Sequence, residues 1–160
     1  MRRKDREVTD PEAIRAIVDK TLYLHLGIRD EGAPYIVPLH YGFREEDGAF
    51  VFYCHSAKEG KKFDLLRRDG RVFVELETDV SPVSGGDVPC RYGSAFASFM
   101  GSGTAEILSD PEEKKEGLAL LMKHQTGRDF VISDMMAATV ELIRIRISEY
   151  SAKRREMPAL

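Results

Sequence analysis

The stretch PYIVPLHYGFREEDGAFVFYC, residues 34–54, decides the fold class. Its first half is an extended run from Pro34 to Phe43, and its second half is the apolar and aromatic run Ala49–Cys54. The polar residues Glu45–Gly48 lie between them and end in Asp-Gly, which is typical of a tight turn joining two strands. The stretch therefore predicts an antiparallel β-hairpin.

The segment before this hairpin has the two-residue period of a half-buried strand. Its apolar face consists of Leu22, Leu24, Leu26 and Ile28, and Asp30-Glu31-Gly32 then supplies a turn. We therefore expect three antiparallel strands in meander order.

The remaining chain predicts three more strands, at about residues 72–77, 94–107 and 143–147. Gly101 and Gly103 interrupt the second of these, and strand glycines often mark a bulge. Residues 78–93 hold two prolines and a Gly-Gly pair and are predicted to be a long loop that borders a pocket. Helices are predicted from Thr9-Asp10 to about Lys20, from Ser56 to Asp69, and from Ser109-Asp110 to Gly127.

About six strands joined mostly by hairpins argue against a parallel sheet with helical crossovers. We expect a mainly β protein with flanking helices, in which a closed or partly closed antiparallel barrel hides the strand edges. The length of 160 residues, 42% of them hydrophobic, predicts a single domain over residues 1–160.

The composition also excludes several classes of function. The 24 Lys and Arg residues do not outnumber the 27 Asp and Glu residues, so no basic excess favours nucleic acid. Neither a long apolar run nor a signal peptide is visible, which predicts a cytoplasmic protein without a membrane segment. Cys54 and Cys90 are expected to be reduced and structural. No motif indicates a metal site, and His25 and His124 are weaker candidates for function than His55.

The segment YCHSAKEGKK, residues 53–62, carries the chemistry. An apolar strand here delivers the Ser56 hydroxyl, a helix start, Gly60 and the adjacent Lys61 and Lys62 to one place. Helix N-termini and lysines bind anions, so this segment predicts a phosphate site. On the residues alone, the alternative is that Ser56 caps a surface helix whose lysines are solvated.

Three blocks together resemble the nitroimidazole-resistance (Nim-type) branch of the pyridoxamine 5'-phosphate oxidase-like FMN-binding split-barrel superfamily. They are MRRKDRE at residues 1–7, PYIVPLHYGF at 34–43 and HSAKEGKK at 55–62. The segment KHQTG at residues 123–127 is also similar, so the resemblance spans about residues 1–155.

This resemblance implies an antiparallel six-stranded split β-barrel that forms a homodimer, with FMN in two symmetric clefts at the subunit interface. It implies a catalytic role for His55 on the substrate side of the flavin. The implied cofactor-binding residues are Val37, Pro38, Leu39, His40 and Tyr41 along the ring, His55 beside it, Ser56, Gly60, Lys61 and Lys62 at the phosphate, and Ser98 of the partner subunit. Ala97 stands where the family typically has an arginine, which removes a cation expected near the cofactor.

The function that follows is an FMN-dependent oxidoreductase that reduces a small acceptor such as a nitroimidazole. Two alternatives stay open. One is a flavin-binding or redox-sensing module without turnover, because fold does not settle function. The other is a split barrel that binds haem or a deazaflavin instead of FMN.

Overall fold

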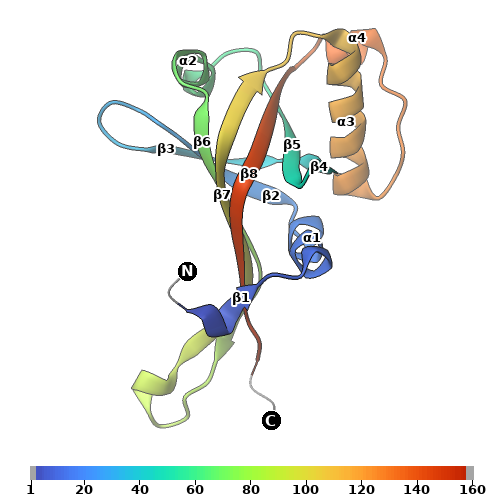
Figure 1. Ribbon diagram of the computed structural model, residues 1–160. Coiled ribbons are helices and arrows are strands. Elements are labelled where there is room, and N and C mark those ends of the chain that lie inside the picture. The colour runs from blue at the N-terminus through green and yellow to red at the C-terminus, as the bar shows by residue number, and fades with distance from the viewer. Residues whose placement is uncertain (1–2, 158–160) are drawn as a thin grey trace.

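A curled antiparallel sheet organises residues 3–157, the part of the chain that the computed structural model describes. The sheet runs in the order β3-β2-β6-β7-β8-β5-β4, with β1 added beside β8 (Figure 1). The strands are β1 Glu7–Val8, β2 Tyr23–Ile28, β3 Tyr35–His40, β4 Gly42–Glu46, β5 Ala49–Ser56, β6 Arg71–Val83, β7 Gly93–Ile107 and β8 Glu141–Arg155. Met1 and Arg2, which begin the first of the three blocks quoted above, lie outside the described residues.

Helices flank this sheet, as expected from the sequence. They are α1 Pro11–Lys20, α2 Lys61–Arg68, α3 Pro111–Thr126 and α4 Asp134–Ala137, with short 3-10 turns at Lys4–Arg6 and Pro89–Arg91. Figure 1 shows α3 and α4 together beside β4 and β5, and α2 near the opposite edge. The mainly β, split-barrel fold class is therefore confirmed.

The predicted number of six strands is wrong, because the described residues form eight. The predicted strand from Pro34 to Phe43 is divided at Tyr41 into β3 and β4. At this point Gly42 packs so closely on α3 that a Cβ there would overlap the backbone of Leu120 and Leu121. The bend lets β3 and β4 occupy the two ends of the sheet order although they are consecutive in the chain.

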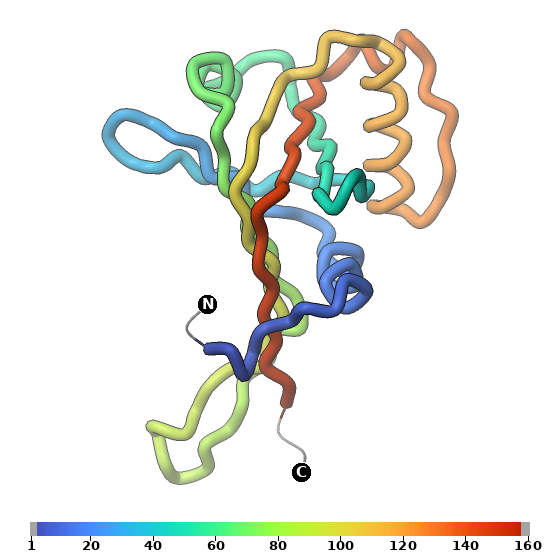
Figure 2. The backbone as a smooth tube through the Cα atoms, viewed as in Figure 1, coloured from blue at the N-terminus to red at the C-terminus, as the bar shows by residue number. Residues whose placement is uncertain are grey.

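The predicted long loop at residues 78–93 is also largely wrong. β6 continues to Val83 and β7 starts at Gly93, so only residues 84–92 connect the two strands. A register shift between Thr78 and Ser81 accommodates Asp79, whose φ is +57°. The paired strands project well beyond the rest of the sheet, as the tube in Figure 2 shows.

The glycines of β7 do mark a bulge, as predicted. The pairing of β7 with β8 shifts register between Ser102 and Gly103. A side chain at Gly103 would overlap the carbonyl of Arg146, so the close approach of the two strands requires glycine.

The core lies inside the curl of the sheet. Leu24, Leu26 and Ile28 of β2 contribute to it with Phe52 and Phe99, and all five side chains are buried. Leu22 does not belong to this face, since it is half exposed before β2 begins.

Each helix start predicted near a Pro is confirmed, because Asp10 and Asp110 accept backbone N–H groups of α1 and α3.

Candidate cofactor site

The end of β5 and the start of α2 meet as the sequence predicts, but their local structure differs. Ser56 is the last residue of β5, and α2 begins five residues later, with Gly60 at its N-cap. The expectation that Ser56 caps this helix is therefore wrong. Its hydroxyl instead accepts a hydrogen bond of 2.6 Å from Nζ of Lys62, the second residue of α2.

Gly60 makes this arrangement possible. Its φ of +135° lies in the region that side-chain-bearing residues rarely adopt. The nearest atom to a Cβ built at this position would be Nζ of Lys62, at 4.0 Å. A small anion could therefore approach the backbone here next to the ammonium group.

Lys61 turns in the other direction from Lys62. Its Nζ forms an ion pair of 2.8 Å with Asp30 Oδ2 in the β2–β3 connection, and it lies 5.3 Å from the centre of the Tyr35 ring. The hydrogen bond from Lys61 and the backbone N–H of Glu31 lower the pKa of Asp30, which also contacts Arg68. The two lysines are adjacent in sequence but have different partners.

The residues of β3 alternate between the core and the outer face. Val37 and Leu39 are half-buried against the core, whereas Pro38 and His40 are exposed. Tyr41 follows β3 and is completely buried, with its hydroxyl donating to the Val18 carbonyl. The Tyr41 side chain is therefore part of the core and does not line the surface of the protomer.

His55 stands exposed beside Ser56, near the end of β5. Partial burial and, to a smaller extent, the nearby His40 lower its pKa from the ordinary value of 6.5. Both effects disfavour the charged imidazole and favour the neutral one. The predicted residues His40 and His55 thus come from two different strands, and His40 is near enough to His55 to lower its pKa.

Ser98 lies elsewhere in the protomer. It is buried on β7, between Glu77 of β6 and Lys153 of β8, and its neighbour Ala97 is in the core. The part of β7 next to α2 is Ala105, whose N–H donates to Gly70. The seven residue steps of extended chain from Ser98 to Ala105 span about 23 Å. Within one chain, Ser98 is therefore distant from the group formed by Ser56, Gly60, Lys61 and Lys62, which we call the Ser56–Lys62 group.

A flavin phosphate fits the Ser56–Lys62 group on its chemistry. The group presents a hydroxyl, an ammonium and a glycine whose Cβ position is open. It also contains the N-terminus of α2, where the backbone N–H groups of Lys61 and Lys62 precede the first intrahelical hydrogen bonds. The donors are matched to an oxyanion, because each offers a proton or a positive charge.

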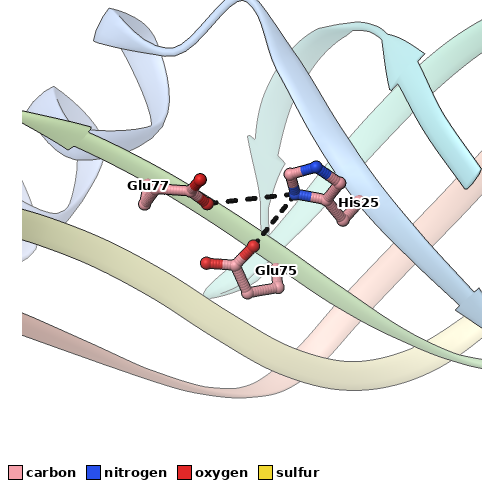
Figure 3. Close-up of side chains that lie close together, drawn as sticks. All are labelled: His25, Glu75 and Glu77. Atoms are coloured by element: carbon pink, nitrogen blue, oxygen red, sulfur yellow. Dashed lines mark hydrogen bonds and ion pairs between the residues drawn. The ribbon is translucent and has the colours of Figure 1, made fainter. Parts of the chain in front are cut away.

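A second cluster was not predicted from the sequence. His25 of β2 and Glu75 and Glu77 of β6 converge on the outer face of the sheet (Figure 3). His25 Nδ1 lies 3.0 Å from Glu75 Oε2 and 3.9 Å from Glu77 Oε2. Burial and the neighbouring Glu77 raise the pKa of Glu75. His25 and Glu75 are direct cross-strand partners, although they are 50 residues apart in the chain.

Among residues 3–157, no helix has both the length and the apolar character that crossing a bilayer would require.

Comparisons with known proteins agree with this fold. A family model described as pyridoxamine 5'-phosphate oxidase matches residues 10–154. The chain is also similar to the solved structure of a candidate 5-nitroimidazole antibiotic resistance protein from Bacteroides thetaiotaomicron. The two share 30% identity over 92% of this chain and 85% of that chain, with a TM-score of 0.77.

More distant structures share the fold alone. A flavocytochrome from Azotobacter vinelandii is 23% identical over 100% of this chain and 74% of that chain, with a TM-score of 0.78. An FAD-binding protein from Mesorhizobium loti is 22% identical over 92% of this chain and 96% of that chain, with a TM-score of 0.64. No curated protein matches the sequence.

The family match covers nearly all of the described chain, from the N-cap of α1 to the end of β8. It includes the curled sheet, the Ser56–Lys62 group and both exposed histidines of the candidate site. The chain therefore belongs to the pyridoxamine 5'-phosphate oxidase family.

Proposed function

We propose that this protein is an FMN-dependent oxidoreductase that reduces a small acceptor such as a nitroimidazole. The observation that carries the proposal is the contact of Lys62 with Ser56 beside Gly60, at the start of α2. Family membership supports a flavin as the ligand, and the small size of the site at Ser56, Gly60 and Lys62 supports a flavin with one phosphate.

In this proposal, Ser56 and Lys62 hold the phosphate and Lys61 adds charge from the side. The 2.6 Å contact between Ser56 and Lys62 keeps both groups in place before the anion arrives. A preformed site of this kind binds more tightly, because fewer side chains are ordered on binding. Lys61 must share its ammonium with Asp30, so its contribution is smaller.

The flavin ring would lie along β3, where Pro38 and His40 are exposed and His55 stands close by. Val37 and Leu39 would support the strand from the core side, and Tyr41 would act through its backbone position only. When bound, FMN supplies the electron transfer to the acceptor. His55 orients the acceptor by a hydrogen bond, and only its charged imidazolium form would supply a proton to it.

We further propose that the active form is a homodimer with a cleft at each side of the subunit interface. The outer face of the sheet exposes Tyr23, Ile36 and Phe73, with 48%, 63% and 49% of their surfaces accessible. Exposed apolar patches of this kind favour association. Ser98 of the partner subunit would then reach the ring from the far side of the cleft.

The proposed location is the cytoplasm, in keeping with the free thiols of Cys54, which is buried, and Cys90, which is exposed.

The test is an anaerobic absorbance titration of the purified protein with FMN, followed by dithionite and then by one addition of a nitroimidazole. Flavin bands that shift on binding, bleach on reduction and return with the nitro compound support the proposal. Binding without reoxidation by the nitro compound favours a module that holds flavin without turnover. If the protein does not bind FMN but binds haem or a deazaflavin, the cofactor assignment is overturned.

A further inference from the structure

The cluster of His25, Glu75 and Glu77 on the outer sheet face has the arrangement of a metal site. One imidazole nitrogen and two carboxylate oxygens lie within 4.8 Å of one another (Figure 3). Ligand atoms placed about 2.1 Å from a tetrahedral ion are roughly 3.4 Å apart. The distances from His25 Nδ1 to the two glutamate oxygens, 3.0 and 3.9 Å, bracket this spacing.

The backbone holds these groups in position. His25 faces Glu75 across the β2–β6 pair, and Glu77 is two residues further along β6 and so points to the same face. The Tyr23 ring packs edge-on against His25, at 5.9 Å between ring centres. Three ligands on two paired central strands need little rearrangement to close on an ion.

The negative charge of the cluster is also not fully balanced by neighbouring cations, and this observation is independent of the distances between its atoms. Elsewhere in residues 3–157, the partly buried carboxylates of Asp69, Glu46 and Glu113 pair with arginine. Glu75 and Glu77 are 27% and 42% exposed, and within the same described range their only ion-pair partner is His25. The two neighbouring carboxylates therefore share one weak base, and a divalent cation would balance their charge.

We propose that His25, Glu75 and Glu77 bind a divalent first-row metal ion of the zinc class. A nitrogen donor with two carboxylates suits Zn²⁺, whereas Ca²⁺ and Mg²⁺ require a fuller set of oxygen ligands. Three protein ligands leave one position of a tetrahedral ion for water. The ion would tie β2 to β6, and the site requires neither FMN nor turnover.

The test is calorimetric titration of the tag-free, metal-stripped full-length protein with Zn²⁺, together with the visible absorption of Co²⁺ as a probe of nitrogen and oxygen coordination. One ion should bind per chain. His25→Ala should weaken binding by at least about tenfold, since even losses in the shell around a metal's ligands have effects of that size. Glu75→Gln and the more exposed Glu77→Gln should do the same, and circular dichroism checks that each variant is folded.

Glu149→Gln is the matched control, because Glu149 lies on β8 at an exposed position outside the cluster and should leave Zn²⁺ affinity unchanged. Absence of binding by the wild-type protein overturns the proposal and reduces the cluster to an ion pair. Binding that survives in folded His25→Ala at wild-type affinity also overturns it. FMN binding is measured on the same samples, so failure of the metal site is distinguishable from failure of the flavin site.

Discussion

At the residue scale, the different partners of Lys61 and Lys62 make the two lysines unequal. Lys62 already touches Ser56, whereas Lys61 is paired with Asp30. Lys62→Ala should therefore weaken FMN binding by about 10- to 100-fold, the usual effect of losing a charged hydrogen bond. Lys61→Ala should weaken it less. Fluorescence titration measures both, with the exposed Lys58→Ala as control, and equal losses at 61 and 62 would contradict the assignment.

Asp30 should act against phosphate binding, because it competes for the ammonium of Lys61. Asp30→Asn removes this competing charge and should tighten FMN binding by a few-fold, provided that Lys61 reaches the phosphate. Glu31→Gln is the matched control, since Glu31 is the next residue and pairs with Arg68 but not with Lys61. The same titration decides the matter, and weaker binding in Asp30→Asn would show that Asp30 positions Lys61 for its role.

His55 should have a pKa below 6.5, because burial and then His40 disfavour its charged form. The folded state then binds fewer protons than the unfolded state just below pH 6.5. The stability that the folded protein gains from a neutral His55 is therefore complete above the pKa of the unfolded state. It is lost as the pH falls through the lower pKa of the folded state. NMR titration of the imidazole measures the value. His40→Gln should raise the pKa of His55, and His25→Gln should leave it unchanged. A pKa of His55 that does not change in His40→Gln would contradict the predicted proximity of the two histidines.

What the sequence predicts at this scale depends on separation along the chain. Ser56, Gly60 and Lys62 are close in sequence, so their meeting at one site was predictable from local pattern. The exact role of Ser56 was not, because an N-cap and a strand end carry the same residue types. His25 and Glu75 are 50 residues apart and meet only through the register of β2 with β6. The pattern of residues within each strand does not determine which residues of the two strands pair with each other.

At the scale of elements, the division of β3 from β4 at Tyr41 depends on Gly42. A Cβ there would meet the backbone of α3, which cannot move as a flexible side chain can. Gly42→Ala should cost about 1–3 kcal/mol or more and lower the melting temperature by several degrees. Gly32→Ala is the control, because nothing lies within 4 Å of its Cβ position. Calorimetry compares them, and equal melting temperatures would show that this contact does not define the bend.

The sequence predicted the type of most elements but not their lengths. Alternation of apolar residues identified β2 and β8, a continuous apolar and aromatic run identified β5, and capping residues identified α1 and α3. β6 was predicted too short, since Pro82, Pro89 and the Gly85-Gly86 pair suggested a loop. The pairing of β6 with β7 out to Val83 and Gly93 overrides this local preference. A strand that continues only because its neighbour continues cannot be recognised from its own residues.

At the scale of the whole molecule, the outer sheet face exposes large apolar side chains on neighbouring strands. Ile36 of β3 and Phe73 of β6 are the cross-strand partners of Gly27 on its two sides. Because Gly27 has no side chain, the sheet surface between these two exposed residues is bare backbone. Tyr23, which is also exposed, lies on the same face four residues before Gly27 in β2, on the other side of His25. A single chain gains nothing from displaying these side chains to water, whereas a second copy could cover them.

Phe73→Glu should therefore convert the proposed dimer to a monomer, because an unpaired carboxylate buried at an interface costs several kcal/mol, about 3–5 by analogy with broken buried pairs. Sedimentation equilibrium should give twice the chain mass of 18.1 kDa for the wild type and the single mass for the variant. FMN affinity should fall in parallel, since each cleft would lose the residues that the partner contributes. Val131→Glu is the control, because Val131 is 95% exposed between α3 and α4, away from this face. A monomeric Phe73→Glu variant that binds FMN as tightly as the wild type would remove the interface from the cofactor site.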